Sequence, residues 1–540
     1  MTDVVANQPP PRVGVDEFGL NRALVEAVAR YDAEWALGDL HEAGKLVGSA
    51  AFQSDAELAN RHEPTLHTHD RWGNRIDEVE YDESYHRIIA SAVAHGAHTS
   101  AWADPKPGAN VARAAMFMLF AQVEPGHACP ISMTHSAVPA LAASPELEAE
   151  WLPRLLSRDY SGSLEAGKTS ALFGMAMTEK QGGSDVRANT TRAAAADATD
   201  AGDGRWLLSG HKWFCSAPMS DAFLVLAQAP QGLSCYLLPR VLADGTRNAF
   251  AIQRLKDKVG NRSNASSEVE FDGTTAFLLG EEGRGVRTII EMVARTRLDC
   301  VYGSAAGMRQ SVAEALWHAR HRSAFGAKLV DQPAMTAVLA DLALESEAAT
   351  ATALRLARAH DDDVSEQERA FRRLATAVSK YWICKRGPEH AYEAMECLGG
   401  NGYTEDFPVG RRYREQPVMA IWEGSGTVIA LDVLRAITRE PETVDAFDAE
   451  VTLADGAHPV FDAWLAETRA LLRRAGELDA GRARGLAERL ALTLQASLLL
   501  RFAPPAVAEA FVAARLGQER GRLYGSLPAG TDLRAILDRS

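Results

Sequence analysis

Residues 175–186 read MAMTEKQGGSDV, and this stretch marks the place where the chain changes from helical to β-rich sequence. A β-prone run ends at Thr178, and two glycines then lead into Ser184. Glycines let backbone N–H groups approach a ligand closely, and the two hydroxyls can hydrogen-bond polar edges or phosphate. The stretch is either a ligand-binding turn or an ordinary glycine turn, and the residues alone leave both interpretations open.

Six short β-prone runs, each bounded by turn residues, begin at this stretch. Runs of this length and spacing predict an antiparallel sheet or barrel of roughly 100–120 residues. They occupy residues 173–178, 205–214, 222–228, 234–240, 249–254 and 266–271. The alanine-rich and polar segment 193–204, between the first two runs, predicts an exposed hairpin loop.

Helical periodicity lies on both sides of the β-rich segment. In residues 85–97 and 111–122 apolar side chains recur three and four positions apart. The same period returns after Gly285 and predicts long helices over about 286–322, 333–360 and 366–397. The fold class is therefore α+β, with a helical domain at 1–172, a β domain at 173–285, a helical domain at 286–440 and a helical extension at 441–540.

The composition is that of an ordinary globular protein. The 540 residues are 46% apolar and 24% charged, which excludes extended disorder, and the net charge of −15 argues against a chain built uniformly to coat nucleic acid. Six scattered cysteines form no CxxC pair, so neither a metal site nor a disulfide framework is expected. No run is long and apolar enough to span a membrane, and residues 1–12 do not resemble a signal peptide, so we expect a cytoplasmic protein.

Two further runs have a chemical and a plain interpretation. HKWFCS at 211–216 places Trp213 beside Phe214 within a predicted strand. Adjacent aromatic rings can cover a flat ligand, although such pairs are also common in protein cores. GEEGRG at 280–285 has the wrong glycine spacing for a dinucleotide fingerprint, so we interpret it as a connection between the sheet and the next helix.

IWEGSG at 421–426 precedes a predicted helix at 427–438. A carboxylate at Glu423 beside Trp422 could be desolvated and act as a general base. Because the helix begins only a few residues later, Glu423 is equally well a helix-capping acid.

Together the stretches near 178, 213 and 423 resemble the flavin-dependent acyl-CoA dehydrogenase superfamily in identity, order and spacing. Further segments similar to family motifs are KVGNRSNAS at 258–266, with Asn264 in place of the family's serine, RSAFG at 322–326 followed by Gln332, and LGGNGY at 398–403. The segments 177–186 and 255–266, the chain length and the C-terminal extension are similar to the alkylation-response (AidB-like) branch of that superfamily.

The resemblance implies the acyl-CoA dehydrogenase fold, namely an N-terminal helical domain, a middle antiparallel β-barrel domain and a C-terminal four-helix domain, here followed by the extension. It also implies FAD held between these domains and across a subunit interface of a dimer or dimer of dimers. The residues carried over as FAD contacts are Met175, Met177, Thr178, Gly182, Gly183, Ser184, Trp213, Phe214, Cys215, Ser216, Arg322, Gln332, Ile421, Gly424, Ser425 and Thr427. Of these, Arg322 and Gln332 would reach the dinucleotide of a neighbouring subunit.

Glu423 matches the catalytic carboxylate of the family, which removes the α-proton of an acyl thioester while a hydride leaves the β-carbon for flavin N5. Such a weak carbon acid needs a positioned base in a dry site, and the flavin is needed because protein side chains offer no hydride acceptor. Cys215 departs from the family pattern, which has a small or β-branched residue there, and Glu396 stands where most members have Gln.

The C-terminal extension is rich in arginine. Residues 469–540 contain twelve arginines and seven carboxylates. An arginine-rich face suits phosphate, although it could equally be a solvated helix face that pairs with acidic neighbours. The AidB-like resemblance implies double-stranded DNA as a partner, bound through phosphate contacts with little sequence preference, and the candidate contacts are Arg435, Arg473, Arg474, Arg482 and Arg484.

The favoured hypothesis is therefore an FAD-containing, DNA-binding protein of the alkylation response with weak or residual acyl-CoA dehydrogenase activity. A working acyl-CoA dehydrogenase for short or branched acyl thioesters is the alternative. A nitroalkane oxidase is disfavoured because such enzymes generally use Asp as the base, and a purely structural flavin in a DNA scaffold is a fourth possibility.

Overall fold

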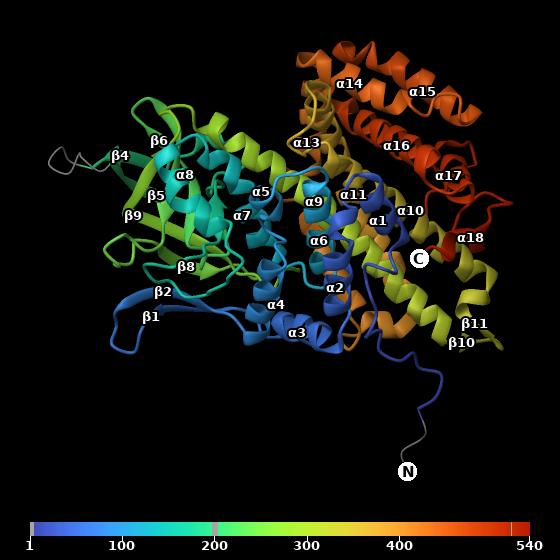
Figure 1. Ribbon diagram of the computed structural model, residues 1–540, viewed down its shortest axis with the longest axis horizontal. Coiled ribbons are helices and arrows are strands. Elements are labelled where there is room, and N and C mark those ends of the chain that lie inside the picture. Colours follow the sequence, from blue (N-terminus) through green and yellow to red (C-terminus); the bar gives the residue numbers. More distant parts are fainter. Residues whose placement is uncertain (1–4, 197–203, 520) are drawn as a thin grey trace. The chain divides into compact units, whose positions relative to one another are not determined.

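The structure, a computed structural model, describes residues 5–196, 204–519 and 521–540. The chain forms two compact units, which Figure 1 colours by sequence. The first unit contains the N-terminal segment up to residue 53, residues 105–123 and residues 297–540. The second unit contains residues 54–104 and 124–296.

A sheet of seven strands that closes on itself forms the centre of the second unit. Strands β4, β5, β9, β7 and β6 pair in that order, and a pairing between β6 and β4 completes the ring. Strand β3 joins β6, and β8 joins β9. The strands are β3 (Phe173–Ala176), β4 (Arg192–Ala195), β5 (Arg205–Ser216), β6 (Ala222–Ala229), β7 (Gly232–Pro239), β8 (Ala251–Leu255) and β9 (Ser266–Leu279).

All six predicted β-prone runs are strands, but two details of the β domain differ from the prediction. The four-residue strand β4 was not predicted, because RAAA lacks β-branched and aromatic residues. The expected sheet is purely antiparallel, whereas β3 pairs with β6 in parallel. The long connection between these two strands permits parallel pairing. Residues 197–203 of the predicted loop at 193–204 lie outside the described residues.

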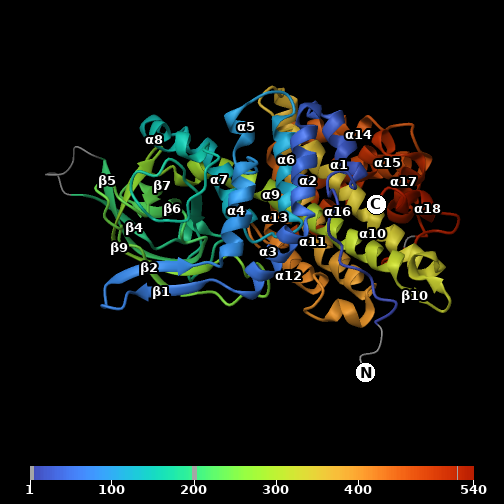
Figure 2. The same cartoon turned by 60° about the horizontal axis from the view of Figure 1, so that its bottom comes forward.

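The second unit also contains a hairpin of β1 (Thr65–His69) and β2 (Arg75–Glu80), seen as two adjacent blue strands in Figure 2. The predicted helical domain at 1–172 did not include it. Strand β1 is polar and has no buried residue, so it carries no clear apolar alternation. The helices of this unit are α4 (Glu83–Ala94), α5 (Ser100–Ala103), α7 (Ala128–Leu141) and α8 (Pro145–Leu155), and α7 packs against β3.

The first unit is helical and is centred on α11, against which α10, α12, α13, α14 and α16 pack. The predicted long helices are confirmed to within about two residues as α9, α10 and α11. Helix α9 begins in the second unit and continues into the first. The helices here are α1 (Arg22–Arg30), α2 (Leu37–Val47), α6 (Ala109–Ala121), α9 (Gly285–His321), α10 (Pro333–Arg358), α11 (Glu366–Glu396), α12 (Val409–Met419) and α13 (Gly426–Arg439).

The C-terminal extension is an integral part of the first unit. It comprises α14 (Pro441–Thr452), α15 (Pro459–Leu472), α16 (Ala483–Phe502), α17 (Pro505–Phe511) and α18 (Leu533–Leu537). Buried leucines of α16 pack against α10, α11 and α13. Arg355 of α10 is buried between Glu450 of α14, at 2.6 Å, and Glu368 of α11, at 2.7 Å. Apolar burial and this charged network together fix the extension on the helical core.

None of the described helices combines the length and the apolar content that crossing a membrane requires. All six cysteines are buried, and none of them forms a disulfide within the described residues.

Candidate active site

The loop after β3 is held in place by a buried carboxylate. Glu179 accepts hydrogen bonds from Lys212 Nζ at 2.9 Å and from the backbone N–H groups of Thr190 and Thr191 at 2.6 and 3.1 Å. Burial opposes ionisation of Glu179, but these hydrogen bonds outweigh it and hold its pKa well below the usual range. The carboxylate therefore stays ionised, and the loop that follows Thr178 is rigidly anchored.

This anchored loop brings together three residues predicted to contact the flavin. Gly183 lies so close to Thr178 that an added Cβ would approach the Thr178 hydroxyl to 2.3 Å, so only glycine fits. The backbone N–H of Trp213 donates to the Thr178 carbonyl at 2.8 Å. Two segments 35 positions apart in sequence thus meet at one edge of the barrel. Around them Gly182, Met175 and Met177 are half-buried and Ser184 is exposed.

The aromatic pair on β5 is not ordinary core. Phe214 is 49% exposed, and Trp213 is half-buried among cations. Lys256 Nζ lies 3.4 Å from the centre of the Trp213 ring and 4.7 Å from that of Phe214. The face of the Phe214 ring is therefore open to a ligand, and the nearby Lys256 gives it a positive environment.

Behind the aromatic pair the strand is closed. Cys215 is buried, and burial raises the pKa of its thiol to about 12, so it remains a neutral thiol. The Ser216 hydroxyl lies 3.1 Å from that of Ser266. Within the described chain, the buried Asn264 Oδ1 receives no hydrogen bond. A buried acceptor without a donor is uncommon in folded proteins, and here it lies in the segment that matches the family motif.

In the first unit, the loop between α12 and α13 holds Glu423 by its backbone. Lys380 of α11, which is buried, donates from Nζ to the carbonyl oxygens of Trp422 and Gly424 at 2.8 and 2.6 Å. Arg297 of α9 donates from Nε to the carbonyl oxygen of Glu423 at 2.9 Å. Three successive carbonyls are thus bonded to two fixed cations, and Glu423 adopts the left-handed conformation with φ of 58°.

Glu423 does not occupy the N-cap of the helix that follows it. Ser425 occupies the N-cap of α13, and the first turn of that helix contains no acidic residue. The loop instead lies on an apolar floor, because Trp422 packs against a buried cluster of Cys300, Cys384 and Met419. Glu423 itself is half-buried beside this floor.

A hollow of about 330 Å³ adjoins the same loop and contains two cations. Its lining residues are Lys385, Pro388, Pro417, Ala420, Ile421, Ser425, Gly426, Thr427 and Arg484. Arg484, which comes from α16 of the extension, donates to the Thr427 hydroxyl at 3.1 Å. A Cβ on Gly426 would lie 3.6 Å from Lys385 Nζ and 3.7 Å from Arg484 Nη2. Two cations that face a helix N-terminus form a favourable environment for phosphate.

Arg322 and Gln332 lie elsewhere in the first unit, at the end of α9 and the start of α10. Gln332 Nε2 donates to the Ala324 carbonyl at 2.8 Å, and Arg322 contacts the N-terminal segment. Arg297, which contacts Glu423, precedes Arg322 by 25 positions on α9, or roughly 37 Å at about 1.5 Å per residue. Arg322 and the backbone of Glu423 therefore lie near opposite ends of this length of α9.

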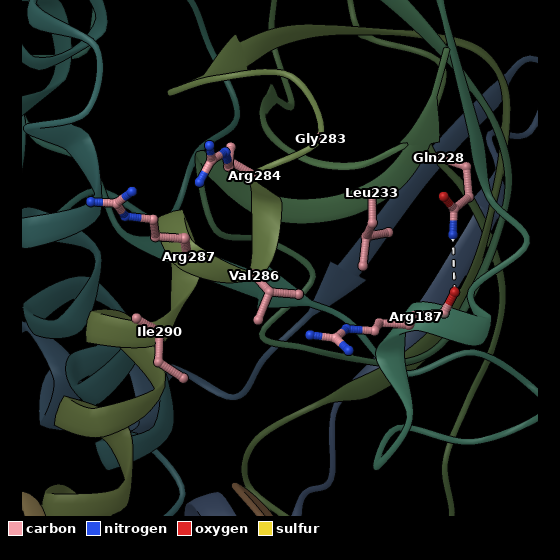
Figure 3. A pocket seen from close by; sticks show the side chains of 8 residues that line it. All are labelled: Arg187, Gln228, Leu233, Gly283, Arg284, Val286, Arg287 and Ile290. Carbon is pink, nitrogen blue, oxygen red and sulfur yellow. Dashed lines mark hydrogen bonds between the residues drawn. The ribbon is translucent and has the colours of Figure 1, made fainter. Parts of the chain in front are cut away.

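A second and larger hollow, of about 520 Å³, lies in the second unit (Figure 3). Figure 3 shows Leu233 and Val286 between Arg187 on one side and Arg284 and Arg287 on the other. Gln228 Nε2 fixes the short helix η2 (Val186–Ala188) by donating to the Arg187 carbonyl at 3.1 Å. Sequence reasoning missed this site, because the run 280–285 was interpreted as a plain connection and Arg187 is about a hundred residues away.

The arginines of the extension divide into two groups. Arg469, Arg489, Arg501, Arg515, Arg534 and Arg539 pair with carboxylates of the same unit. Arg473 and Arg482 are exposed, Arg474 lies 3.3 Å from Glu477, and the side chain of Arg435 is 60% exposed. The segment η5 (Ala475–Glu477) packs against α13, which carries Arg435, so these arginines lie on neighbouring elements.

Comparisons with known proteins match three parts of the chain to described families. Residues 7–162 match the adaptive response protein AidB N-terminal domain, residues 174–274 the acyl-CoA dehydrogenase middle domain, and residues 283–438 the acyl-CoA dehydrogenase C-terminal domain. The protein named "Putative acyl-CoA dehydrogenase AidB" from Escherichia coli (strain K12) is 43% identical, with 96% of this chain and 95% of that protein covered.

Two solved structures share the fold over nearly the whole chain. The Caenorhabditis elegans protein ACDH-11, solved in complex with C11-CoA, superimposes with a TM-score of 0.86 at 25% identity, covering 95% of this chain and 93% of that one. The apo-form of Bd2924 gives a TM-score of 0.82 at 28% identity, covering 94% and 99%.

Proposed function

The chain belongs to the acyl-CoA dehydrogenase family, in its AidB-like branch, and from that premise we propose that it is a DNA-binding flavoprotein of the alkylation response with weak acyl-CoA dehydrogenase activity. It is an FAD-dependent oxidoreductase of the acyl-CoA dehydrogenase type. The physiological role, the DNA partner and the low activity are the proposed parts. The observation that carries the catalytic part is the backbone of Glu423, which Lys380 and Arg297 hold from both sides.

The residues present fit FAD. In the second unit, the close contact of Gly183 with Thr178 and the open face of Phe214 would receive the ring system. In the first unit taken by itself, Ser425, Thr427, Lys385 and Arg484 offer polar and positive groups suited to an anionic ligand. When bound, FAD supplies the hydride acceptor that protein side chains lack.

Glu423 is the proposed base that removes the α-proton of an acyl thioester. Lys380 and Arg297 fix its backbone, so its carboxylate loses little orientational freedom when substrate binds. Trp422, next to Glu423, packs on the apolar floor, which leaves one side of the loop inaccessible to polar partners.

The arginine hollow of the second unit supports a thioester of coenzyme A as the ligand. Arg187, Arg284 and Arg287 provide guanidinium groups for phosphates, and Leu233 and Val286 provide an apolar surface for a flat base. The C11-CoA bound to the C. elegans relative supports the same class of ligand.

The proposed assembly is a homo-oligomer, a dimer of dimers, in which FAD is shared. Arg297, which contacts Glu423, lies 25 positions before Arg322, which directly follows α9. This separation supports sharing, because each cofactor would then meet Glu423 of one copy and Arg322 of another. Phe325, which is fully exposed, and Tyr403, which is 87% exposed, lie in the two motif segments that would face the second copy. A cytoplasmic location is part of the proposal and agrees with six cysteines that form no disulfide in the described part of the chain.

Double-stranded DNA is the proposed macromolecular partner. The exposed arginines 435, 473, 474 and 482 on neighbouring elements support a phosphate-binding face, even though Arg435 and Arg474 also lie near one carboxylate each. Largely buried arginines such as Arg501 instead hold the extension together. Contacts to phosphate would make the binding strongly dependent on salt and weakly dependent on sequence.

Anaerobic reduction of the bound flavin by a panel of acyl-CoA thioesters and nitroalkanes tests the catalytic part. We expect slow bleaching by short or branched acyl-CoA, and we expect Glu423→Gln to abolish it, whereas Glu442→Gln, at an exposed acid on α14, has no effect. Rapid bleaching would favour the alternative, a working acyl-CoA dehydrogenase. Bleaching that survives in Glu423→Gln would remove Glu423 from the mechanism.

A further inference from the structure

The N-terminal segment Asn7–Pro10 is hydrogen-bonded to the end of α9 and to the residues that follow it. The Asn7 carboxamide pairs with the backbone of Ser323, accepting from its N–H at 2.7 Å and donating to its carbonyl at 2.8 Å. These two bonds imitate the pairing of a neighbouring strand, so the short hairpin of β10 (Ser323–Ala324) and β11 (Ala327–Lys328) gains an additional partner.

Gln8 joins two segments that match the family's cofactor motifs. Its Oε1 accepts from Arg322 Nη1 at 3.2 Å and from Asn401 Nδ2 at 3.1 Å. Arg322 Nη1 also donates to the Asn7 carbonyl at 2.9 Å. One carboxamide oxygen thus links the segment at 322–326 to the segment at 398–403, and the guanidinium of Arg322 is held in one orientation.

The segment is anchored further along its length. Trp317 Nε1 donates to the Pro10 carbonyl at 2.7 Å, and Arg12 forms a buried ion pair with Glu17. Asn7 adopts the left-handed conformation with φ of 58°, which asparagine tolerates better than most residues. An unusual backbone conformation held by bonds on both sides indicates that the position of the segment is specified.

The acceptors that hold Arg322 are all neutral. Within the described residues Arg322 has no ion pair with a carboxylate, whereas most arginines of the extension do. Carbonyl and carboxamide oxygens orient a guanidinium without cancelling its charge. Arg322 therefore keeps a full positive charge in a fixed direction at an exposed end of the first unit, as a contact for an anionic ligand requires.

We propose that Asn7 and Gln8 are positioning residues of the FAD site, which hold Arg322 and the β10–β11 hairpin ready for the phosphates of a cofactor bound mainly by a second copy of the chain. This inference rests on the proposed function, because it takes shared FAD as given. In this proposal the N-terminal segment orients the Arg322 guanidinium and leaves its positive charge available to the cofactor phosphates.

The test is the affinity of flavin-depleted protein for FAD, measured by quenching of flavin fluorescence. Gln8→Met removes the side-chain acceptor of Arg322, and Asn7→Ala removes the two bonds to Ser323 that fix the segment whose backbone carbonyl Arg322 contacts. We expect each to weaken FAD binding on the order of 5–10-fold. Gln53→Met on α3 (Ala50–Arg61) removes a comparable carboxamide bond, to the Val47 carbonyl, and should leave FAD affinity unchanged.

Gln8→Glu separates positioning from mere structural support. It keeps both accepted hydrogen bonds but neutralises Arg322, so FAD affinity should fall at least as far as in Gln8→Met while the unfolding temperature is maintained. A purely structural Gln8 would instead keep normal FAD affinity as Glu, and that result would overturn the proposal.

Two further measurements distinguish the ways in which the idea could fail. If Arg322→Ala weakens FAD binding but Gln8→Met and Asn7→Ala do not, the positioning role is wrong and the shared site stands. If Arg322→Ala has no effect, the proposed sharing of FAD through Arg322 is wrong as well. The mass of the oligomer, measured on the same samples, must stay constant, and dissociation that parallels the loss of FAD would assign Gln8 to the subunit contact instead.

Discussion

Arg297 donates a hydrogen bond of 2.9 Å from Nε to the backbone carbonyl of Glu423, not to its carboxylate. The same arginine pairs with Asp432 of α13 at 3.0 Å. Arg297 thus bonds to the backbone carbonyl of Glu423 and to the Asp432 carboxylate. It fixes the backbone of the proposed base and is not the partner of its carboxylate. Lys380 works in the same way from α11, through the carbonyls on either side.

Replacing Lys380 by Met should loosen this loop. Two carbonyls would lose their buried donor, and we expect the free energy of unfolding to fall by about 1–3 kcal/mol. The rate of flavin reduction by acyl-CoA should fall at least tenfold, because the base is no longer pre-oriented. Urea unfolding and anaerobic stopped-flow reduction measure the two effects. Lys45→Met, at an exposed lysine of α2, is the control, and an unchanged reduction rate in Lys380→Met would show that the backbone contacts do not serve catalysis.

The three arginines of the second unit should set the affinity for the CoA part of a substrate. Arg284→Gln combined with Arg287→Gln removes two guanidinium groups from the hollow, and we expect CoA to bind at least tenfold more weakly. Flavin content should not change. Isothermal titration with CoA measures the affinity, and Arg71→Gln in the turn between β1 and β2 serves as the control. Equal affinity in the double variant would place the CoA phosphates elsewhere.

Arg484 offers a way to separate the flavin site from the DNA face. Because it donates to Thr427 and lines the hollow beside Glu423, Arg484→Gln should lower FAD affinity several-fold and leave duplex binding nearly intact. Arg473→Gln with Arg482→Gln should do the reverse and also reduce the salt dependence of DNA binding. Flavin fluorescence and duplex titrations at several salt concentrations report the two affinities. A strong loss of DNA binding in Arg484→Gln alone would indicate that Arg484 contacts DNA, as the sequence predicted.

The stability of the second unit should depend on pH through Glu124. Burial opposes its ionisation, but hydrogen bonds and charge from His127, together with a bond from Ser263, lower its pKa to about 2. Because the folded pKa lies below the unfolded value, this stability is complete above about pH 5 and is lost as the pH falls toward 2. It amounts to about 3 kcal/mol.

Urea unfolding between pH 7 and pH 3 tests this account. Glu124→Gln should be less stable at pH 7 and should lose less stability on acidification than the parent protein. Parallel pH profiles for the two proteins would mean that other carboxylates govern the acid response.

The strands and long helices could be predicted because their patterns are local. The runs that became β5, β6 and β9 are rich in apolar and aromatic residues, and α9, α10 and α11 keep their periods over many turns. The polar strand β1 and the alanine strand β4 gave no such signal. Their pairing partners decide their conformation, and single segments do not reveal partners.

The site was predicted unevenly for a related reason. Thr178, Trp213 and Glu423 lie in short motifs, so a resemblance could carry them over. Neither the hollow around Arg187 nor the bond from Arg484 to Thr427 belongs to a contiguous motif, since each joins residues that only the fold brings together. Charge counting over the extension was also an incomplete guide, because seven of its twelve arginines form internal ion pairs among the described residues.

The burial of Arg355 between Glu450 and Glu368 has a consequence for the proposed binding of DNA. Cutting the chain at residue 440 would strip that guanidinium of one of its two acids and uncover the leucine-lined groove that α16 fills. The last hundred residues are thus not an independently moving domain that could bind DNA apart from the rest of the first unit. A duplex on those arginines would press against the same rigid helical block that carries Glu423, so any recruitment to the genome would transport the entire catalytic body along with it.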